Sequence, residues 1–282
     1  MIELTRTVRF FLNDPATEPP PPRHNTFAAW PPARGLGRFY QLKVCCRGET
    51  NAHTGLFLNI KYIDEAVRNQ ALDCLRRALA DSVHGAAVPM GSLMRDLFTA
   101  LRRPLQSTVS RLRLDLSPFY SLMIGSTDMA HVTLTQQYEF AAAHRLHVDR
   151  LSNEENRRLF GKCNSPSGHG HNYRVEVAVC VPIHDDGSTL EVEKLDGMVN
   201  ENVIGKLDHK NLNLDVPEFQ NLNTSVENIV KVIYAMLADD VSELGADLES
   251  VSVWETSKTV CTYRGEGEGE KERREKGAET WG

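Results

Sequence analysis

The sequence lacks the features that identify several common classes of protein. Its six cysteines include no C-x-x-C pair, and in a chain of 282 residues they do not form a disulfide framework. No apolar run approaches the length of a membrane span, and the first residues lack the basic-then-apolar order of a signal peptide. We therefore expect a cytoplasmic protein without a membrane segment.

An excess of positive charge is also missing. The formal net charge is −6 and the isoelectric point lies near 5.9, which gives no electrostatic reason to expect nucleic acid as a partner. Apolar content is present, because 41% of the residues are hydrophobic, enough for a packed core. At this length, two domains of ordinary size are predicted.

The first half of the chain combines strand and helix patterns. A strand is predicted within residues 1–14, and a Pro-rich loop follows from Pro15 to Pro32. The other elements predicted for this half are a strand at 39–45, a turn at 51–55, an antiparallel partner strand at 56–60, a helix from Ile63, a short helix between 82 and 107, and a strand at 112–116.

The second half begins with apolar residues of one parity, which predict a strand that ends at His144. Ser152 with Glu155, and Thr224 with Glu227, form capping boxes, and each predicts the start of a helix. The other predicted elements are a strand from His169, a turn at 185–187, a strand at 189–192, a helix at 195–203, a polar loop at 207–213 and a last strand at 251–263.

Two histidines, His169 and His171, stand on one predicted strand with only Gly170 between them. Residues two apart in a strand point to the same face, so both imidazoles leave one side of the sheet. A catalytic zinc site typically takes three protein ligands and keeps one position open. His144 is the predicted third ligand. A lone histidine at a strand end is more often structural, but its combination with the pair favours the metal.

Cys163 stands on a loop rich in Gly, Pro, Ser and Asn. Lys162 precedes it, and a positive charge favours the thiolate, so Cys163 is a candidate base or nucleophile. The alternative is an inert loop thiol. Asp208 and His209 have no strong meaning alone. If they fold next to Cys163, the carboxylate can orient the imidazole, which can then exchange a proton with substrate or thiol.

Glu255 has the same parity as Val251 and Val253, so the strand is predicted to turn a carboxylate inward. Burying an anion is costly unless a donor meets it. The edge of a ligand with two adjacent N–H donors would satisfy the carboxylate, and so would a buried Arg or Lys; the sequence leaves both open. Glu227 is more easily explained by its capping box than by contact with a ligand.

The two halves share an order of elements and several short matches. Residues 35–40 parallel residues 168–173, and equivalent positions such as 36 and 169 are 133 apart. Further matches join Gly55 with Gly187, Asp64 with Asp196, residues 112–116 with 251–255, and residues 27–30 with 140–143. We predict tandem units at 1–126 and 130–264 and a disordered charged tail at 265–282. Chance similarity of two α+β units is the alternative.

Together these residues resemble the 6-pyruvoyltetrahydropterin synthase family, from about Thr133 to Glu266. The resemblance rests on separated motifs in the right order, namely Ala-His-Arg-Leu at 143–146, Leu-Phe-Gly-Lys-Cys-Asn-x-Pro-x-Gly-His-Gly-His-Asn-Tyr at 159–173, Leu-Asp-His-Lys-Asn-Leu at 207–212, Val-Glu-Asn at 226–228 and Glu-Thr at 255–256.

The resemblance implies an α+β tunnelling fold (T-fold), in which an antiparallel sheet with two helices on one side assembles into a β-barrel with neighbouring units. The implied reaction is the zinc-dependent conversion of 7,8-dihydroneopterin triphosphate to 6-pyruvoyltetrahydropterin with loss of triphosphate. The implied roles are Zn²⁺ binding by His144, His169 and His171, proton abstraction by Cys163 with Asp208 and His209 as its relay, and pterin binding by Glu255 with Ser225 and Glu227 nearby.

A sister family, 6-carboxytetrahydropterin synthase of queuosine biosynthesis, is similar in its site. Five residues separate Cys163 from His169, a spacing that resembles the pyruvoyl enzymes. A non-catalytic pterin-binding protein and, more weakly, a zinc hydrolase are further alternatives. The first half departs from the family, since Leu36, Arg38 and Leu116 stand where two histidines and a glutamate are needed. We expect a homo-oligomer, in which three tandem chains mimic six family units.

Overall fold

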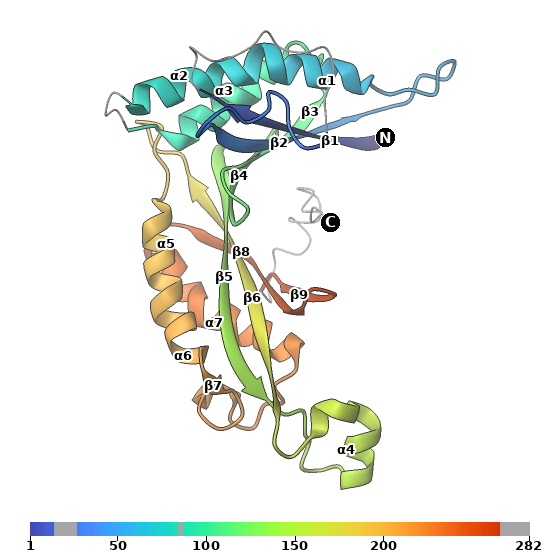
Figure 1. Ribbon diagram of the computed structural model, residues 1–282, viewed down its shortest axis with the longest axis vertical. Helices are drawn as coiled ribbons and strands as arrows, with labels where there is room; N and C mark the ends of the chain where they lie inside the picture. The colour runs from blue at the N-terminus through green and yellow to red at the C-terminus, as the bar shows by residue number, and fades with distance from the viewer. Residues whose placement is uncertain (14–26, 84–86, 266–282) are drawn as a thin grey trace. The chain divides into compact units, whose positions relative to one another are not determined.

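The computed structural model describes residues 1–13, 27–83 and 87–265 (Figure 1). The chain forms two compact units: unit 1 is Met1–Leu134 with Val181–Thr189, and unit 2 is Thr135–Cys180 with Leu190–Gly282. Antiparallel strand pairs and helices make up both, which confirms the α+β class. The tandem division at 1–126 and 130–264 stays a prediction. Residues 14–26 of the Pro-rich loop and 266–282 of the predicted disordered tail lie outside the described residues.

Unit 1 contains an antiparallel sheet in which β1 (Ile2–Leu12), β2 (Arg38–Gly48), β3 (Val109–Asp115) and β4 (Tyr120–Gly125) are neighbours in that order. Side chains alternate between the two faces of a strand. The residues of one face are fully buried, among them Val8, Phe10, Leu42, Val44, Leu112 and Leu114. The sequence analysis missed β4, which follows β3 after a tight turn where Ser117 Oγ accepts from the N–H of Tyr120.

The helices of unit 1 are α1 (Ile60–Ala66), the π-helical η2 (Val67–Ala71), α2 (Leu72–Val83) and α3 (Met90–Arg102), and α1 and α3 contact strands of the sheet (Figure 1). The predicted strand at 56–60 is wrong. The Asn59 side chain accepts from the N–H of Lys61 and caps α1, which turns this segment into a helix start. Both edges of β2 are already occupied by β1 and β3.

Unit 2 contains the end of β5 (Asp128–His144), followed in the sheet by β6 (His169–Pro182), β8 (Asp247–Thr256) and β9 (Thr259–Tyr263). The short β7 (Lys210–Asn211) pairs in parallel with β5, at the predicted polar loop. The prediction of one strand at 251–263 is wrong. The chain reverses after Thr256, whose Oγ1 accepts from the N–H of Lys258, and β8 and β9 pair as a hairpin.

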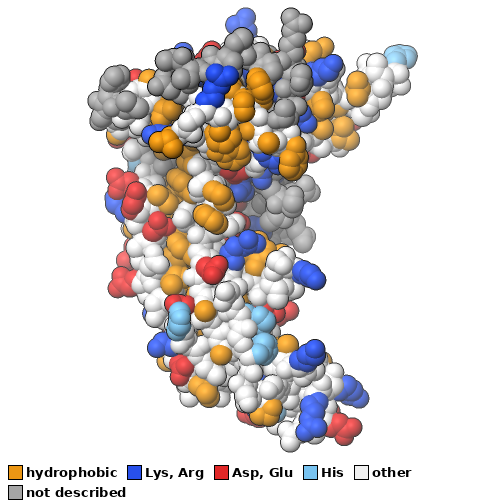
Figure 2. All heavy atoms as spheres, in the orientation of Figure 1, with side chains coloured by type: hydrophobic (Ala, Val, Ile, Leu, Met, Phe, Trp, Pro, Cys, Tyr) orange, Lys and Arg blue, Asp and Glu red, His pale blue; other side chains and the backbone are white. Residues whose placement is uncertain are grey.

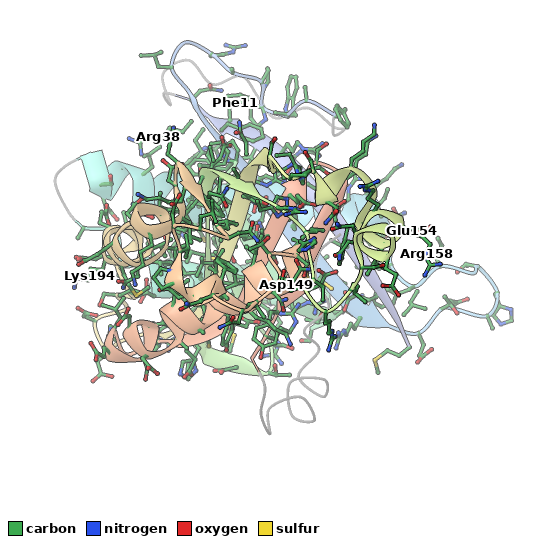
Figure 3. The ribbon with its side chains drawn as sticks, turned by 90° about the horizontal axis from the view of Figure 1, so that it is seen from below. Phe11, Arg38, Asp149, Glu154, Arg158 and Lys194 are labelled. Carbon is green, nitrogen blue, oxygen red and sulfur yellow. The ribbon has the colours of Figure 1, made fainter. Side chains whose placement is uncertain are left out.

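The helices of unit 2 are α4 (Asn153–Phe160), η3 (Gly161–Asn164), α5 (Val192–Val199), η4 (Asn200–Ile204), α6 (Gly205–Leu207), η5 (Pro217–Phe219) and α7 (Val226–Glu243). The capping box of Ser152 and Glu155 is confirmed at the start of α4. Glu154 and Arg158, four residues apart, lie on an exposed face of this helix (Figure 3). The predicted strand at 189–192 is wrong, because the chain enters α5 directly with Glu191 as the N-cap.

Two further predictions fail because tertiary contacts use the residues differently. The N-cap of α7 is Ser225, and the hydroxyl of buried Thr224 donates to the carbonyl of Arg145, so Thr224 and Glu227 form no capping box. Residues 27–30 are not a strand equivalent to 140–143 in β5. They follow the free edge of β1, where the N–H of Trp30 donates to the carbonyl of Arg9.

Among the described residues, no helix combines the length and the apolar character that a membrane crossing requires.

Candidate metal centre

Three histidines meet at the ends of two neighbouring strands of unit 2. His144 is the last residue of β5, and His169 and His171 begin β6. Gly168 makes the approach possible: its φ is +68°, and a Cβ atom there would lie 3.0 Å from the carbonyl oxygen of His144. A side chain would be strained at this position. Figure 2 shows histidine side chains gathered at the surface of this unit.

The three imidazoles have the spacing of a metal site. One ring nitrogen from each histidine lies within 4.8 Å of the others, and Nε2 of His144 lies 3.1 Å from Nε2 of His169. His144 is fully buried, whereas His169 and His171 are half-buried. A site open on one side suits a catalytic metal, which leaves one position for water or substrate.

The hydrogen bonds of the histidines also fit a metal. Nδ1 of His144 lies 2.8 Å from the carbonyl oxygen of Thr224, which orients Nε2 toward the other rings. Nδ1 of His169 and Nε2 of His171 are buried and have no hydrogen-bond partner among the residues that the structure describes. A buried polar atom without a partner is costly. A cation between the rings would give the Nε2 atom of His171 the partner that it lacks.

Burial also favours the metal-binding protonation state. It lowers the pKa of His144 and of His171 below the ordinary value for histidine, while the Glu255 carboxylate opposes the shift at both. The neutral imidazole is the form that binds a metal. Burial thus favours the neutral, metal-binding form of His144 and His171, two of the three predicted ligands, near neutral pH.

Glu255 turns its carboxylate toward the histidines. Its Oε1 lies 3.3 Å from Nε2 of His144 and 3.6 Å from Nε2 of His171. The pairing of β8 with β9 is irregular between Trp254 and Thr256, and such a bulge re-aims the residue between them. Of the two partners that the sequence left open, no Arg or Lys among the described residues pairs with this carboxylate. It faces the candidate metal site at 22% side-chain exposure.

Cys163 lies in η3, close to the site in sequence and in space. It is a free, half-buried cysteine, and its carbonyl accepts from the N–H of Leu146, two residues after His144. Burial raises the pKa of Tyr173, and the charges of Glu255 and Cys163 add to the effect. Cys163 and Glu255 therefore belong to the surroundings of the same buried tyrosine. The role of Cys163 as a base stays a prediction.

Asp208 and His209 form a dyad beside the end of β5. Nδ1 of His209 lies 2.7 Å from Oδ2 of Asp208, and Oδ1 of Asp208 accepts from the N–H of Ala141 at 2.8 Å. The pKa of Asp208 lies below its ordinary value because of this N–H and of His209. The His209 side chain is 83% exposed, and no hydrogen bond within the described chain joins the dyad to Cys163. Its relay role also stays a prediction.

The two remaining predicted residues lie at the start of α7. Ser225 is the N-cap, without a side-chain capping bond, and Glu227 is in the first turn. Burial raises the pKa of Cys261, and Glu227 contributes to this shift, so the Glu227 carboxylate is near the β9 cysteine. Neither Ser225 nor Glu227 is bonded to the histidines in the described chain.

Sequence reasoning missed Thr224 as the partner of His144. It also missed Tyr173, whose ring centroid lies 5.5 Å from that of His171 and whose buried hydroxyl has no hydrogen-bond partner in the described part of the chain. Tyr173 was visible only as one of the alternating apolar residues of a strand. Thr224 looked like a helix cap, and no local pattern marks a carbonyl as the partner of a distant histidine.

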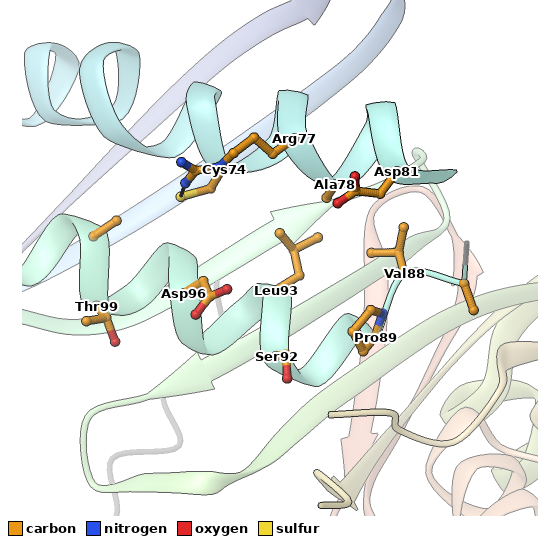
Figure 4. Close-up of a pocket in the computed structure, with 12 residues that line it drawn as sticks. Cys74, Arg77, Ala78, Asp81, Val88, Pro89, Ser92, Leu93, Asp96 and Thr99 are labelled. Atoms are coloured by element: carbon orange, nitrogen blue, oxygen red, sulfur yellow. Dashed lines mark hydrogen bonds between the residues drawn. The ribbon is translucent and has the colours of Figure 1, made fainter. Parts of the chain in front are cut away.

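A cavity of about 760 Å³ lies within unit 1, between α2 and α3 (Figure 4). Arg77, Asp81 and Asp96 are its charged lining residues. It contains none of the predicted site residues, so the candidate chemistry does not lie there.

Comparison with known proteins concerns the second half of the chain. Residues 133–266 match the family described as 6-pyruvoyl tetrahydropterin synthase. The human protein named 6-pyruvoyl tetrahydrobiopterin synthase is 40% identical over 143 residues, which are 50% of this chain and 97% of the relative. A Poecilia reticulata protein of the same name is 42% identical over 135 residues, which are 47% of this chain and 90% of the relative.

A solved structure of the Caenorhabditis elegans 6-pyruvoyl tetrahydropterin synthase has 35% sequence identity and a TM-score of 0.46, covering 48% of this chain and 96% of that one. The segment matched by the family includes the three histidines, Cys163 and Glu255. At 40% identity, the chain spans nearly the full length of the human relative. It therefore belongs to the 6-pyruvoyl tetrahydropterin synthase family.

Proposed function

We propose that this chain is a zinc-dependent 6-pyruvoyltetrahydropterin synthase, a carbon–oxygen lyase that acts on 7,8-dihydroneopterin triphosphate. The observation that carries the proposal is the convergence of three histidine nitrogens within 4.8 Å, inside the segment that matches the family. Three neutral imidazoles and an open side are typical of catalytic zinc. His144, His169 and His171 would hold the ion.

A bound zinc supplies Lewis-acid chemistry, which polarises substrate oxygens. The other steps belong to side chains of this chain. Cys163 takes a proton from the substrate side chain, and the His209 imidazole, oriented by Asp208, exchanges a hydroxyl proton. Elimination expels triphosphate, and tautomerisation moves hydrogen from the side chain into the ring, so no external reductant is needed.

Substrate orientation is the proposed task of Glu255. Its carboxylate accepts two adjacent N–H donors of the pterin ring, as charge-assisted hydrogen bonds. The direction of the carboxylate, toward the histidines, supports a ring bound beside the metal. Ser225 and Glu227, at the start of α7, are proposed to line the same site.

The decisive experiment is incubation of the zinc-loaded protein with 7,8-dihydroneopterin triphosphate, analysed by mass spectrometry. We expect 6-pyruvoyltetrahydropterin from the parent chain and from the control Cys74→Ala, and none from Cys163→Ala. A carboxy-pterin with acetaldehyde would assign the chain to queuosine synthesis. Pterin binding without any product would make it a binding protein.

The proposal includes tandem T-fold units, and strand register supports it. In unit 1, β2 pairs with β3 at Leu42 and Leu114. In unit 2, β6 pairs with β8 at Val175 and Val253. Residues 42 and 175 are 133 apart, like 36 and 169, and residues 114 and 253 match in the predicted repeat. Two units that resembled each other by chance would have no reason to share this register.

Irregular features recur at equivalent positions. The register shift between Cys45 and Cys46 in unit 1 has its counterpart between Ala178 and Val179 in unit 2. The π-helical segments η2 and η4 begin at residues 67 and 200, within one residue of the spacing of 132 that relates Asp64 to Asp196 in the preceding helices. π-helical turns are rare, so their coincidence favours duplication of one ancestral unit.

A side-chain contact is repeated as well. In unit 1, Arg6 on the first strand donates to both carboxylate oxygens of Asp64 on the first helix. In unit 2, Tyr138 donates to the equivalent Asp196 at 2.9 Å. Residues 6 and 138 are 132 apart, as are 64 and 196, so the aspartate serves the same strand-to-helix contact in both units.

The same spacing supports the proposal that unit 1 has lost the metal ligands. By the spacing of residues 6 and 138, Leu12 is equivalent to His144, and Leu12 is paired with Arg38 in the sheet. Unit 1 thus has Leu12, Leu36 and Arg38 where unit 2 has three histidines. The proposed role of unit 1 is structural, as a strand donor to a barrel of three tandem chains. Three chains of 31.6 kDa predict a solution mass of about 95 kDa; any mass incompatible with a trimer contradicts this part.

A further inference from the structure

His144 is held differently from the other two histidines. Its side chain is fully buried, and Nδ1 lies 2.8 Å from the carbonyl oxygen of Thr224. A carbonyl oxygen can only accept a hydrogen bond, so Nδ1 of His144 must carry the proton. In the neutral ring Nε2 is then unprotonated and free to bind a cation. The chain therefore selects the tautomer of His144 through a backbone group 80 residues away.

The position of the Thr224 carbonyl depends on the side chain of the same residue. Oγ1 of Thr224 lies 3.2 Å from the carbonyl oxygen of Arg145 and 3.4 Å from Oδ1 of Asn213. Thr224 is fully buried, so its hydroxyl has no water to use instead. These bonds attach Thr224, the residue before the N-cap of α7, to Arg145, the residue after His144.

Asn213 completes the attachment from the loop after β7. Its Oδ1 accepts from the N–H of Arg145 at 2.7 Å, and its Nδ2 donates to the carbonyl of Arg145 at 3.0 Å. One amide side chain thus satisfies both backbone groups of the residue after His144, as a paired strand would. Strand β5 ends at His144. The Asn213 side chain then pairs with the backbone of the next residue, Arg145, in place of a neighbouring strand.

Within the described residues, neither side chain is hydrogen-bonded to the other two histidines. In the same part of the chain, Nδ1 of His169 and Nε2 of His171 are buried without a hydrogen-bond partner. His144 is therefore the ligand whose ring nitrogen is assigned before any ion arrives. Partners outside the ligand shell that fix tautomer and orientation raise metal affinity.

We infer that Asn213 and Thr224 are positioning residues, which hold His144 in the tautomer that presents Nε2 to the metal. This inference rests on the metal site of the proposed function. It adds two residues that act through Arg145 and a backbone carbonyl, without touching metal or substrate. Loss of the hydrogen bonds that the Thr224 hydroxyl or the Asn213 amide makes with Arg145 lets the Thr224 carbonyl move away from Nδ1 of His144.

The tautomer of His144 and the zinc affinity of the chain are tested in two separate measurements. Imidazole nitrogen NMR on metal-free protein at a pH where His144 is neutral reads the tautomer directly, and zinc affinity is then measured by competition with a chelator. We expect the parent chain to have His144 as the Nδ1–H form. Thr224→Val and Asn213→Ala are expected to give mixed tautomers and a zinc affinity lower by about 10–100-fold.

Matched controls remove the same groups elsewhere in unit 2. Thr262→Val removes a hydroxyl that bonds Ser252, and Asn200→Ala removes an amide that donates to the carbonyl of Asp196. Both should retain the parent tautomer and affinity. Thr224→Ser retains the hydroxyl and should restore both readouts. If Thr224→Val or Asn213→Ala folds poorly, Asn213→Asp gives the same two readouts, because it replaces the Nδ2 donor to the Arg145 carbonyl by a negatively charged oxygen that cannot donate.

An unchanged tautomer and an unchanged zinc affinity in the variants would overturn the inference, as would a Nε2–H form in the parent chain. Failure of the proposed function gives a different result, because the NMR measurement needs neither zinc nor pterin. If the parent chain has the Nδ1–H form but makes no pterin product, the proposed lyase activity is refuted. The positioning role of Asn213 and Thr224 then still stands.

Discussion

Oε1 of Glu255 lies 3.3 Å from Nε2 of His144. Since the Thr224 carbonyl accepts a hydrogen bond from Nδ1–H, neutral His144 directs the Nε2 lone pair toward a carboxylate oxygen. Two acceptors at this distance repel each other unless a proton or a cation lies near both. The negative charge of Glu255 therefore acts directly on the candidate metal site. The same carboxylate is the group proposed to bind the pterin ring.

Substitution Glu255→Gln is expected to weaken pterin binding while zinc is retained. Hydrogen bonds to a charged group contribute about 1.5–3 kcal/mol, which corresponds to a loss of roughly 10–100-fold in affinity. Calorimetric titration with a dihydropterin and metal analysis of the same samples measure both effects. Glu249→Gln, on the same strand, is the matched control. Full pterin affinity in Glu255→Gln would contradict the anchoring role.

Removal of one ligand should abolish stoichiometric zinc binding. His171→Ala leaves two imidazoles, so we expect less than one zinc per chain after dialysis. Zinc at about 100 times its dissociation constant stabilises a folded protein by about 2.7 kcal/mol, and this gain in thermal melts should vanish in the variant. His131→Ala, which removes an exposed imidazole bonded to Asp128, should behave like the parent. A full zinc complement in His171→Ala would count against the three-histidine site.

The hydroxyl of Tyr173 is expected to destabilise the folded state of the metal-free protein. It is buried and has no hydrogen-bond partner within residues 1–13, 27–83 and 87–265, and an unpaired buried polar group costs about 1–3 kcal/mol. Tyr173→Phe should therefore raise the free energy of unfolding by about 1 kcal/mol in urea titrations. Tyr234→Phe is the contrast, because its hydroxyl donates to the carbonyl of Leu248 at 3.0 Å, and the variant should be less stable. A loss of stability in Tyr173→Phe would mean that its hydroxyl has a partner.

Asp208 predicts a pH dependence in the acid range. The N–H of Ala141 and the His209 ring hold the pKa of Asp208 below its ordinary value. A lowered pKa in the folded state means that the unfolded chain binds the proton more readily, so the contribution of Asp208 to stability is complete above the ordinary pKa of about 3.9. It is lost as the pH falls through the lowered value.

Thermal melts of the parent and of Asp208→Asn, recorded at several pH values, test this dependence. The parent should be more stable at pH about 6, and the difference should shrink below about pH 4. Asp149→Asn, which removes a fully exposed carboxylate, should change the profile little. A difference that does not vary with pH would show that the charge of Asp208 does not stabilise the fold.

Several features of the fold follow from local pattern. His169 and His171 share a face because side chains alternate along a strand, and β6 begins at His169 as predicted. Ser152 and Glu155 cap α4 because the side chain of each accepts a hydrogen bond from the backbone N–H of the other. These predictions needed only residues within a few positions of one another, where chain geometry leaves few alternatives.

The predictions that failed depended on contacts from elsewhere in the chain. Thr224 has the sequence of a helix cap, but its hydroxyl bonds Arg145, which is 79 residues away. Residues 56–60 are mostly apolar and follow a turn, as the partner strand of a hairpin would, but no edge of β2 is free to pair with them. In both cases a tertiary partner outcompeted the local preference, because a buried polar group or a strand edge must be satisfied wherever the partner lies.

For the candidate site, the amino-acid sequence was sufficient to predict that His144, His169 and His171 come together, because metal-ligand types at strand spacing are a local signal; the roles of Cys163 and Glu255 stay predictions. Folding supplied the rest: the distance between His144 and His169, the tautomer set by Thr224, and the direction of the Glu255 carboxylate at a bulge. These depend on which strands pair and in what register. Register is a property of the packed sheet, in which a shift of one residue would turn every side chain to the other face.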